Sequence, residues 1–218
     1  MSTEHSEIGA VGGLARILDA AADGDFPPSD GLIEVIQPKE ARGLEAVVEF
    51  TGHAVVVTSL PEAEIFTRQI DAFGGIVAPD FLRWLAGPLG RIGAHDAVLV
   101  RRGVGDGRLP QRLDLDDHPR VRLARRLRTD VQVYGDERGL VTLGRGLANR
   151  WEISTELADR APRRRGLGRS LIREGVRLVP ARTPVFASVS PGNAASLRAF
   201  LAAGFRPIGA EVIVSPER

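Results

Sequence analysis

The sequence has no cysteine, a single lysine, a single methionine and few aromatic residues, which make up 5% of its 218 positions. Without cysteine the chain forms no disulfide, offers no thiolate to a metal and has no cysteine nucleophile, a composition that suits the cytoplasm. The four histidines lie far apart and show no metal-ligand spacing, so we expect no metal site. No apolar run is long enough to cross a bilayer, and the acidic first residues differ from a signal peptide, so we expect no membrane association.

Charge is nearly balanced, with 29 basic and 28 acidic residues and a net charge of +1. The positive charge is almost all arginine, and it gathers in residues 120–128 and 160–177. Nucleic-acid-binding domains typically carry a basic face with aromatic side chains that stack on bases. Compensating carboxylates and the low aromatic content therefore argue against nucleic acid as a partner. We interpret residues 160–177 as a phosphate site and residues 120–128 as a solvated helix face.

The most informative segment combines a block of arginines with two glycines at the start of a predicted helix. Arg163, Arg164 and Arg165 are followed by Gly166-Leu167-Gly168, and residues 169–179 have a helical pattern. The first N–H groups of a helix lack internal partners, and glycine lets a phosphate approach the backbone closely. The segment therefore favours an anion-binding loop. The alternative is an arginine-rich connection in which the glycines only turn the chain.

The residues that follow predict a strand, a second helix and a terminal strand. Residues 184–190 form a short β-branched run that reads as a strand. Asn193 is a good N-cap for a helix that Gly204 ends. Residues 205–214 then read as a terminal strand, or as a strand broken near Pro207.

This order resembles the C-terminal half of the GNAT superfamily of acyl-CoA-dependent N-acyltransferases. Its first signature is Arg or Gln, two residues, Gly, one residue, then Gly or Ala, which Arg163, Gly166 and Gly168 match. Its second is an Asn that opens the next helix and a Gly-Phe pair that closes it, matched by Asn193 and Gly204-Phe205. The resemblance covers about residues 94–218.

The resemblance implies an α/β fold with a GNAT-like mixed, centrally splayed β-sheet flanked by helices. We expect this acyltransferase domain to span residues 91–218, and a smaller N-terminal α+β segment of unknown role to span residues 1–90. The predicted helices are 8–22, 61–73, 79–85 and 119–128, and the predicted strands are 32–36, 45–50, 53–58, 95–101, 131–134, 140–143 and 150–157.

The resemblance further implies a binding site for acetyl-CoA. In the family, backbone N–H groups near the end of the fourth strand bind the thioester carbonyl, and the loop before the next helix binds the pyrophosphate. The residues carried over to this role are Leu157, Ala158, Arg163, Arg164, Arg165, Gly166, Leu167, Gly168, Arg169, Ser170, Asn193, Ser196 and Phe200.

Catalysis of N-acyl transfer needs a base for the amine, and two carboxylates on the strand 150–157 are candidates. Glu156 lies closest to the expected thioester position and is the first candidate, and Glu152 is the second; either carboxylate could instead be structural. Many family members carry a tyrosine, as acid for the thiolate, where this chain has Phe200. The acid could then be water, the Ser196 hydroxyl or Tyr134, and Phe200 could pack against the cofactor or in the core.

The sequence therefore predicts an N-acetyltransferase that transfers an acetyl group from acetyl-CoA to a primary amine by direct attack. The acceptor would be the amine of a small molecule or a peptide. The alternative is a non-catalytic acyl-CoA-binding sensor or interaction module on the same fold. Residues 1–90 could shape the acceptor pocket or form a homodimer interface.

Overall fold

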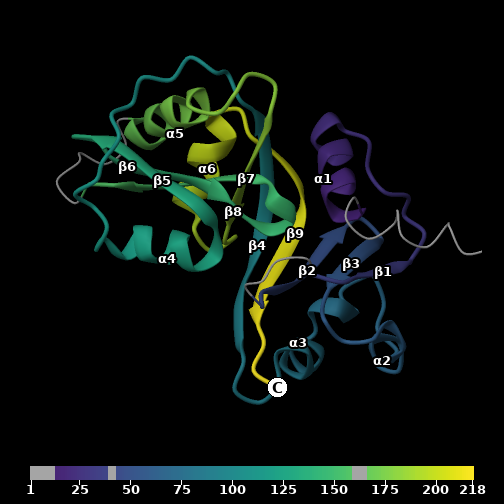
Figure 1. The fold of residues 1–218 in the computed structure, drawn as a ribbon. Coiled ribbons are helices and arrows are strands. Elements are labelled where there is room, and N and C mark those ends of the chain that lie inside the picture. The colour runs from purple at the N-terminus through teal and green to yellow at the C-terminus, as the bar shows by residue number, and fades with distance from the viewer. Residues whose placement is uncertain (1–12, 39–42, 159–165) are drawn as a thin grey trace, which may run out of the picture. The chain divides into compact units, whose positions relative to one another are not determined.

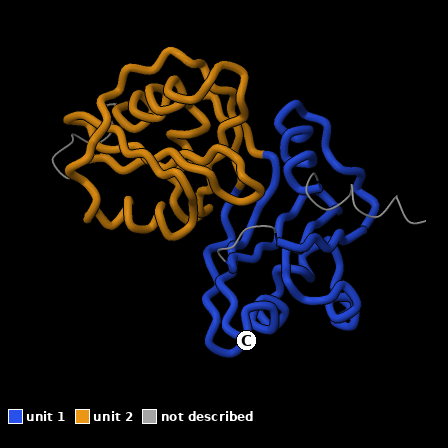
Figure 2. The backbone as a smooth tube through the Cα atoms, in the orientation of Figure 1, with its two compact units in different colours: residues 1–97, 208–218 blue, residues 98–207 orange. Residues whose placement is uncertain are grey.

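The computed structural model describes residues 13–38, 43–158 and 166–218. The chain forms two compact units, residues 1–97 with 208–218 and residues 98–207 (Figure 2). The chain passes from one unit to the other within two long strands, β4 (Arg91–Arg102) and β9 (Arg206–Ser215). The first unit thus includes the last strand of the chain, whereas the sequence places a single boundary near residue 90.

The first unit combines strands in the order β1-β3-β2-β9-β4 with short helices (Figure 1). Strand β1 runs parallel to β3, whereas β2 is antiparallel to both β3 and β9. The predicted hairpin is confirmed, and Gly52 occupies its turn with a φ of 65°. The elements are α1 (Gly13–Asp23), β1 (Ile33–Ile36), β2 (Glu45–Phe50), β3 (His53–Val57), α2 (Glu62–Phe66), η1 (Gly75–Val77) and α3 (Pro79–Ala86).

One helix of the first unit is shorter than its sequence pattern predicts. The pattern indicates a helix over residues 61–73, but α2 ends at Phe66 and Gln69 has a left-handed φ of 51°. The Asp71 carboxylate accepts hydrogen bonds from the N–H groups of Phe73 at 2.7 Å and Gly75 at 3.1 Å. Because this side chain supplies acceptors that a helix would otherwise provide, a turn replaces the last part of the predicted helix.

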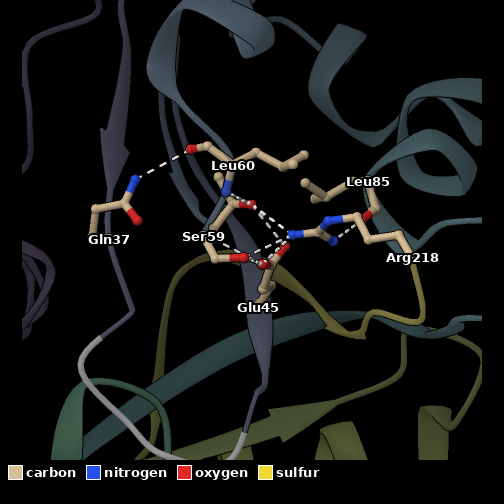
Figure 3. Close-up of polar contacts among 7 residues, drawn as sticks. Gln37, Glu45, Ser59, Leu60, Leu85 and Arg218 are labelled. Carbon is tan, nitrogen blue, oxygen red and sulfur yellow. Dashed lines mark hydrogen bonds and ion pairs between the residues drawn. The ribbon is translucent and has the colours of Figure 1, made fainter.

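A buried carboxylate ties the end of the chain to the first unit (Figure 3). Glu45 is 1% exposed, and its Oε1 accepts hydrogen bonds from the Ser59 N–H at 2.8 Å and from Arg218 Nη2 at 2.5 Å. Its Oε2 accepts from the Thr58 hydroxyl at 2.8 Å. Arg218 Nη1 also donates to the Leu85 carbonyl at 2.5 Å. Burial of this carboxylate is therefore matched by donors from Thr58 and Ser59, the two residues that follow β3, and from Arg218.

The second unit has the strand order β4-β8-β7-β6-β5, with β5, β6 and β7 as an antiparallel meander and β8 parallel to β7. The pattern of strand, helix, three strands, helix, strand, helix and strand is confirmed as the order along the chain. The elements are α4 (Pro119–Leu127), β5 (Thr129–Asp136), β6 (Gly139–Arg145), η2 (Leu147–Asn149), β7 (Trp151–Leu157), α5 (Leu167–Arg177), β8 (Pro184–Val189) and α6 (Ala194–Ala202).

Helices α4 and α5 cover opposite faces of the meander. A Cβ at Gly175 of α5 would lie 2.7 Å from Ile153 and 2.9 Å from Val141, so this glycine lets α5 pack closely against one face. On the other face, Arg128 at the end of α4 donates to Glu152 at 2.7 Å. Because side chains alternate along a strand, Glu152, Ser154 and Glu156 share the face that α4 covers.

The glycines of residues 103–107 serve packing in the second unit. The N–H groups of Gly103 and Gly107 donate to the Thr183 and Arg177 carbonyls, both at 2.8 Å. A Cβ at Gly107 would lie 2.6 Å from the Leu178 backbone nitrogen, so any side chain there would collide with the end of α5. The loop therefore covers the last carbonyls of that helix. None of the helices in the described ranges has the length and apolar character needed to cross a bilayer.

Candidate active site

The parallel pairing of β7 with β8 ends almost where it begins. Among the described residues, two pairs join these strands, Trp151 with Val185 and Glu152 with Phe186. Strand β7 then continues to Leu157 and β8 to Val189 without further pairing between them. From Ile153 onward, β7 is paired with β6 on its other edge. The centrally splayed sheet expected from the sequence is therefore present at the β7–β8 junction.

The N-terminus of α5 begins at a glycine in the left-handed conformation. Gly166 is the N-cap, with φ 73° and ψ 10°, and its carbonyl accepts the N–H of Ser170 at 2.9 Å. Leu167, Gly168 and Arg169 precede that bond, so their N–H groups have no partner four residues earlier within the helix. The helix dipole adds partial positive charge at this end. Three consecutive backbone N–H groups thus lie at the start of α5, and the binding of an anion by them remains a prediction. Arg163, Arg164 and Arg165 lie outside the described residues.

Three predicted elements converge at Gly168. A Cβ built at this glycine would lie 3.7 Å from the Ala199 Cβ of α6 and 4.0 Å from Leu157 Cδ1 at the end of β7. Leu157 is 38% exposed. The start of α5, the end of β7 and one side of α6 therefore meet at a single place, and the binding of a cofactor there remains a prediction.

Arg138, in the turn between β5 and β6, holds this end of α5. Its Nη1 donates to the Ser170 hydroxyl at 2.6 Å, and its Nε donates to the two Asp136 oxygens at 2.9 and 3.0 Å. The Arg138 guanidinium lowers the pKa of Asp136, chiefly through these hydrogen bonds. Ser170 is therefore engaged by a fixed cation that the sequence alone does not place beside it.

Asn193 caps α6 as predicted. Its side-chain oxygen accepts the N–H of Ser196 at 3.1 Å, which satisfies one of the first donors of the helix. The further roles of Asn193 and Ser196 as contacts to a cofactor remain predictions.

Phe200 belongs to the core of the second unit. It is 3% exposed, and its ring packs edge-to-face against Phe205 with centroids 5.0 Å apart. Of the two positions expected from the sequence, this is the core position. The expected contact between the Phe200 ring and a cofactor would require a ring surface that its core neighbours cover.

We expect Phe200→Tyr to lower the free energy of unfolding by about 1–3 kcal/mol, because the added hydroxyl would be buried without a partner. Thermal or urea denaturation measures this loss. Phe73→Tyr is the control, since Phe73 is 71% exposed and a hydroxyl there can reach water. Unchanged stability of Phe200→Tyr would place that ring edge at an open surface and restore the predicted cofactor contact.

Glu152 is a buried carboxylate held by two arginines, which favours the structural reading of this residue over its role as second candidate base. It is 7% exposed and accepts from Arg128 Nε at 2.7 Å and Arg150 Nε at 2.8 Å. Burial acts to raise the pKa of Glu152, but the charges of Arg150 and Arg128 outweigh this effect and the pKa lies below its ordinary value. A carboxylate held in its charged form by two buried guanidinium groups is a poor proton acceptor.

Glu156 lies at the other end of the same face and is half-exposed. Its Oε2 accepts from Arg120 Nε at 3.0 Å, and its Oε1 lies 3.9 Å from His118 Nε2. The Glu156 side chain is 41% exposed and the His118 side chain 29%. One carboxylate oxygen is therefore held by α4, while the other faces a histidine and solvent.

Helix α4 is fastened to β7 by an arginine at each end. Arg120 and Arg128 are eight residues apart, a rise of about 12 Å in a helix. Glu156 and Glu152 are four residues apart, about 13 Å in a strand. The matching lengths allow both ion pairs, so residues 120–128 are not simply the solvated face that the sequence suggests. On the side of α4 away from β7, arginine side chains do face solvent, and Arg122 there pairs with the exposed Asp117 at 2.8 Å.

The backbone at the end of β7 separates the two predicted carbonyl-binding residues. The Ala158 N–H donates to the Arg138 carbonyl at 3.0 Å, so this donor is already engaged. Because donors alternate between the two edges of a strand, the Leu157 N–H points away from β6, toward the β8 edge. Leu157 is therefore the better placed of the two to bind a carbonyl oxygen there.

Three residues near the site were missed by reasoning from the sequence: His118, Arg120 and Arg138. His118 precedes Pro119, and a capping side chain before a proline is a local signal for the start of a helix. No local pattern indicates that His118 and Arg120 meet Glu156, 36 or more positions later. Among the described residues, no group of three or more His, Asp or Glu side chains could hold a metal ion.

The chain has few detectable similarities to known proteins. No model of a known protein family matches the chain, and no curated protein matches it. Among solved structures, the chain is similar to a protein from Novosphingobium aromaticivorans DSM 12444 described as an acetyltransferase from the GNAT family. The two share 18% identity over 60% of this chain and 69% of the other, with a TM-score of 0.37. At so low a TM-score, the likeness assigns neither a fold family nor an activity.

Proposed function

We propose that this protein is a GNAT-like N-acetyltransferase that transfers an acetyl group from acetyl-CoA to a primary amine. The observation that carries the proposal is the convergence of the open β7–β8 junction with the N-terminus of α5 at Gly168 and Leu157. A phosphorylated acyl carrier would use an anion site for its phosphates and a backbone N–H donor, such as one on an unpaired strand edge, for its carbonyl oxygen. The two lie side by side in the second unit.

The described residues fit the chemistry of coenzyme A. The N–H groups of Leu167, Gly168 and Arg169 would bind its pyrophosphate, and the lack of a side chain at Gly168 would let the phosphate approach. Arg138 adds a fixed positive charge beside Ser170. Arg163, Arg164 and Arg165 would supply further charge from the preceding segment. The thioester then supplies an activated acetyl group for attack by the amine.

Leu157 and Glu156 are the residues proposed to act on the reacting groups. The Leu157 N–H would donate to the thioester carbonyl oxygen, whose negative charge grows as the amine nitrogen attacks. Glu156 would accept the proton of the ammonium group, directly or through water, by its outward oxygen Oε1. Phe200 is buried and has no proton to donate, so water or Ser196 would protonate the departing thiolate.

The test is to incubate the purified protein with acetyl-CoA and a panel of primary amines, including peptide N-termini, and to measure release of free thiol. Turnover with any amine supports the enzyme. Binding of coenzyme A by calorimetry without turnover supports the alternative, a non-catalytic acyl-CoA sensor. That alternative is favoured by one observation, namely that Arg120 already occupies one oxygen of Glu156.

We expect Glu156→Gln to lower kcat by a factor of about 10²–10⁴, the typical contribution of a positioned base, without changing coenzyme A affinity. The acidic limb of the pH–rate profile should also be lost. Steady-state kinetics across pH and calorimetry measure the two effects. Glu137→Gln, in the turn between β5 and β6, is the control and should behave like wild type. A wild-type pH–rate profile in Glu156→Gln would assign proton removal to water.

A further inference from the structure

The side chain of His118 joins two features of the second unit, the N-cap of α4 and the free oxygen of Glu156. Its Nδ1 accepts the N–H of Arg120 at 3.1 Å, which satisfies one of the first donors of the helix. Its Nε2 lies 3.9 Å from Glu156 Oε1. The two ring nitrogens therefore have different neighbours, one a donor and the other a carboxylate.

The cap determines which ring nitrogen carries the proton. An imidazole nitrogen accepts a hydrogen bond only through its lone pair, so Nδ1 is unprotonated while the cap is formed. In the neutral ring the single proton is then on Nε2, the nitrogen that faces Glu156. In this tautomer His118 offers Glu156 an N–H group and has no lone pair with which to act as a base there.

We infer that His118 is a positioning residue for Glu156, with its Nε2–H oriented toward the free carboxylate oxygen by the N-cap of α4. Together with Arg120, which holds Oε2 at 3.0 Å, it places a donor beside each oxygen of the carboxylate. Arg120 holds Oε2 by a hydrogen bond, and the Nε2–H of His118 attracts Oε1 across 3.9 Å, so the pair favours one direction in which Oε1 can meet an incoming amine. This role rests on the proposed function, whereas the tautomer itself does not.

Two variants separate the cap from the contact with Glu156. Asparagine is among the best N-caps, but its side chain is too short to place a donor where Nε2 lies. His118→Asn should therefore keep the melting temperature of the wild type, whereas His118→Ala should lower it.

For His118→Asn we expect kcat to fall between about tenfold and a hundredfold, with KM for acetyl-CoA unchanged, because a misplaced base lowers the rate and not the affinity for the cofactor. Arg122→Ala is the control, since it removes a neighbouring exposed ion pair and should leave kcat unchanged.

The tautomer can be measured whether or not the protein turns over a substrate, by two-bond ¹H–¹⁵N correlation spectra of the imidazole in labelled protein. A protonated Nε2 and an unprotonated Nδ1 are expected at a pH where the ring is neutral. A protonated Nδ1 overturns the inference, and so does a wild-type kcat in His118→Asn when the wild-type enzyme is active. If wild type turns over no amine, the proposed function fails, and the positioning role fails with it even if the spectra show the expected tautomer.

Discussion

Glu152→Gln should destabilise the protein by about 3–5 kcal/mol, the usual result of removing one partner from a buried ion pair. The substitution preserves the size of the side chain but removes the negative charge that pairs with Arg128, at 2.7 Å, and with Arg150, at 2.8 Å. The side chains of all three residues are at most 9% exposed, so water cannot replace the lost charge. Urea denaturation followed by circular dichroism measures the change.

Glu156→Gln is the matched control for this measurement. It makes the same chemical change on the same face of β7, but its side chain is 41% exposed and pairs with one arginine. Exposed ion pairs contribute about 0–1 kcal/mol, so this variant should stay folded. A loss below about 1 kcal/mol in Glu152→Gln as well would show that the two arginines find other partners or water, and would contradict a stabilising role for the buried group.

The buried carboxylate of Glu152 should contribute to the free energy of unfolding in a pH-dependent way. The pKa of Glu152 is lower in the folded protein than that of an exposed glutamate. Its contribution is therefore fully present above the unfolded-state pKa, about 4.3, and is lost as the pH falls through the lower folded-state value. Glu152→Gln should lack this acid-dependent component, so the stability difference between the two proteins should shrink toward low pH.

The second large effect is expected at the start of α5, where Gly168→Val should weaken coenzyme A binding well over tenfold. Backbone N–H bonds to a charged phosphate contribute about 1.5–3 kcal/mol each, and a side chain at this position would keep the phosphate away from them. Calorimetric titration with coenzyme A measures the loss. Dephospho-coenzyme A, titrated in parallel, tests whether arginines of the 163–165 block meet the outer phosphate.

Two further variants distinguish a lost ligand site from a damaged fold. Gly168→Ala should fold and bind with an intermediate affinity, because its Cβ would make only ordinary contacts with Ala199 and Leu157, at 3.7 and 4.0 Å. Gly192→Val places the same side chain in the loop before α6, where only Ser190 Oγ lies within 4 Å, and should bind like wild type. Unchanged affinity in a folded Gly168→Val protein would rule out this loop as the phosphate site.

The sequence by itself determined the type and order of most elements, because their signals are local, although α2 ends at Phe66 and not at the predicted residue 73. The β-branched runs on either side of Thr51-Gly52 predicted the hairpin of β2 and β3, and Asn193 predicted the cap of α6, since a capping bond spans three residues. A glycine directly before a helical pattern indicated a turn at residue 166, and Gly166 does adopt a left-handed conformation there. Along the chain, the order of elements in residues 91–218 followed directly from these signals.

Only the tertiary structure decided what those elements bring together. Glu152 and Glu156 look equivalent in sequence, yet one is buried between two arginines and the other is half-exposed, because Arg128 and Arg120 reach them from positions 24 and 36 residues away. Phe200 was assigned to the core by its contact with Phe205. Strand β9 pairs with β2 within the first unit, although more than 150 positions separate the two strands. Burial and long-range pairing depend on the packing of distant segments, which no local pattern encodes.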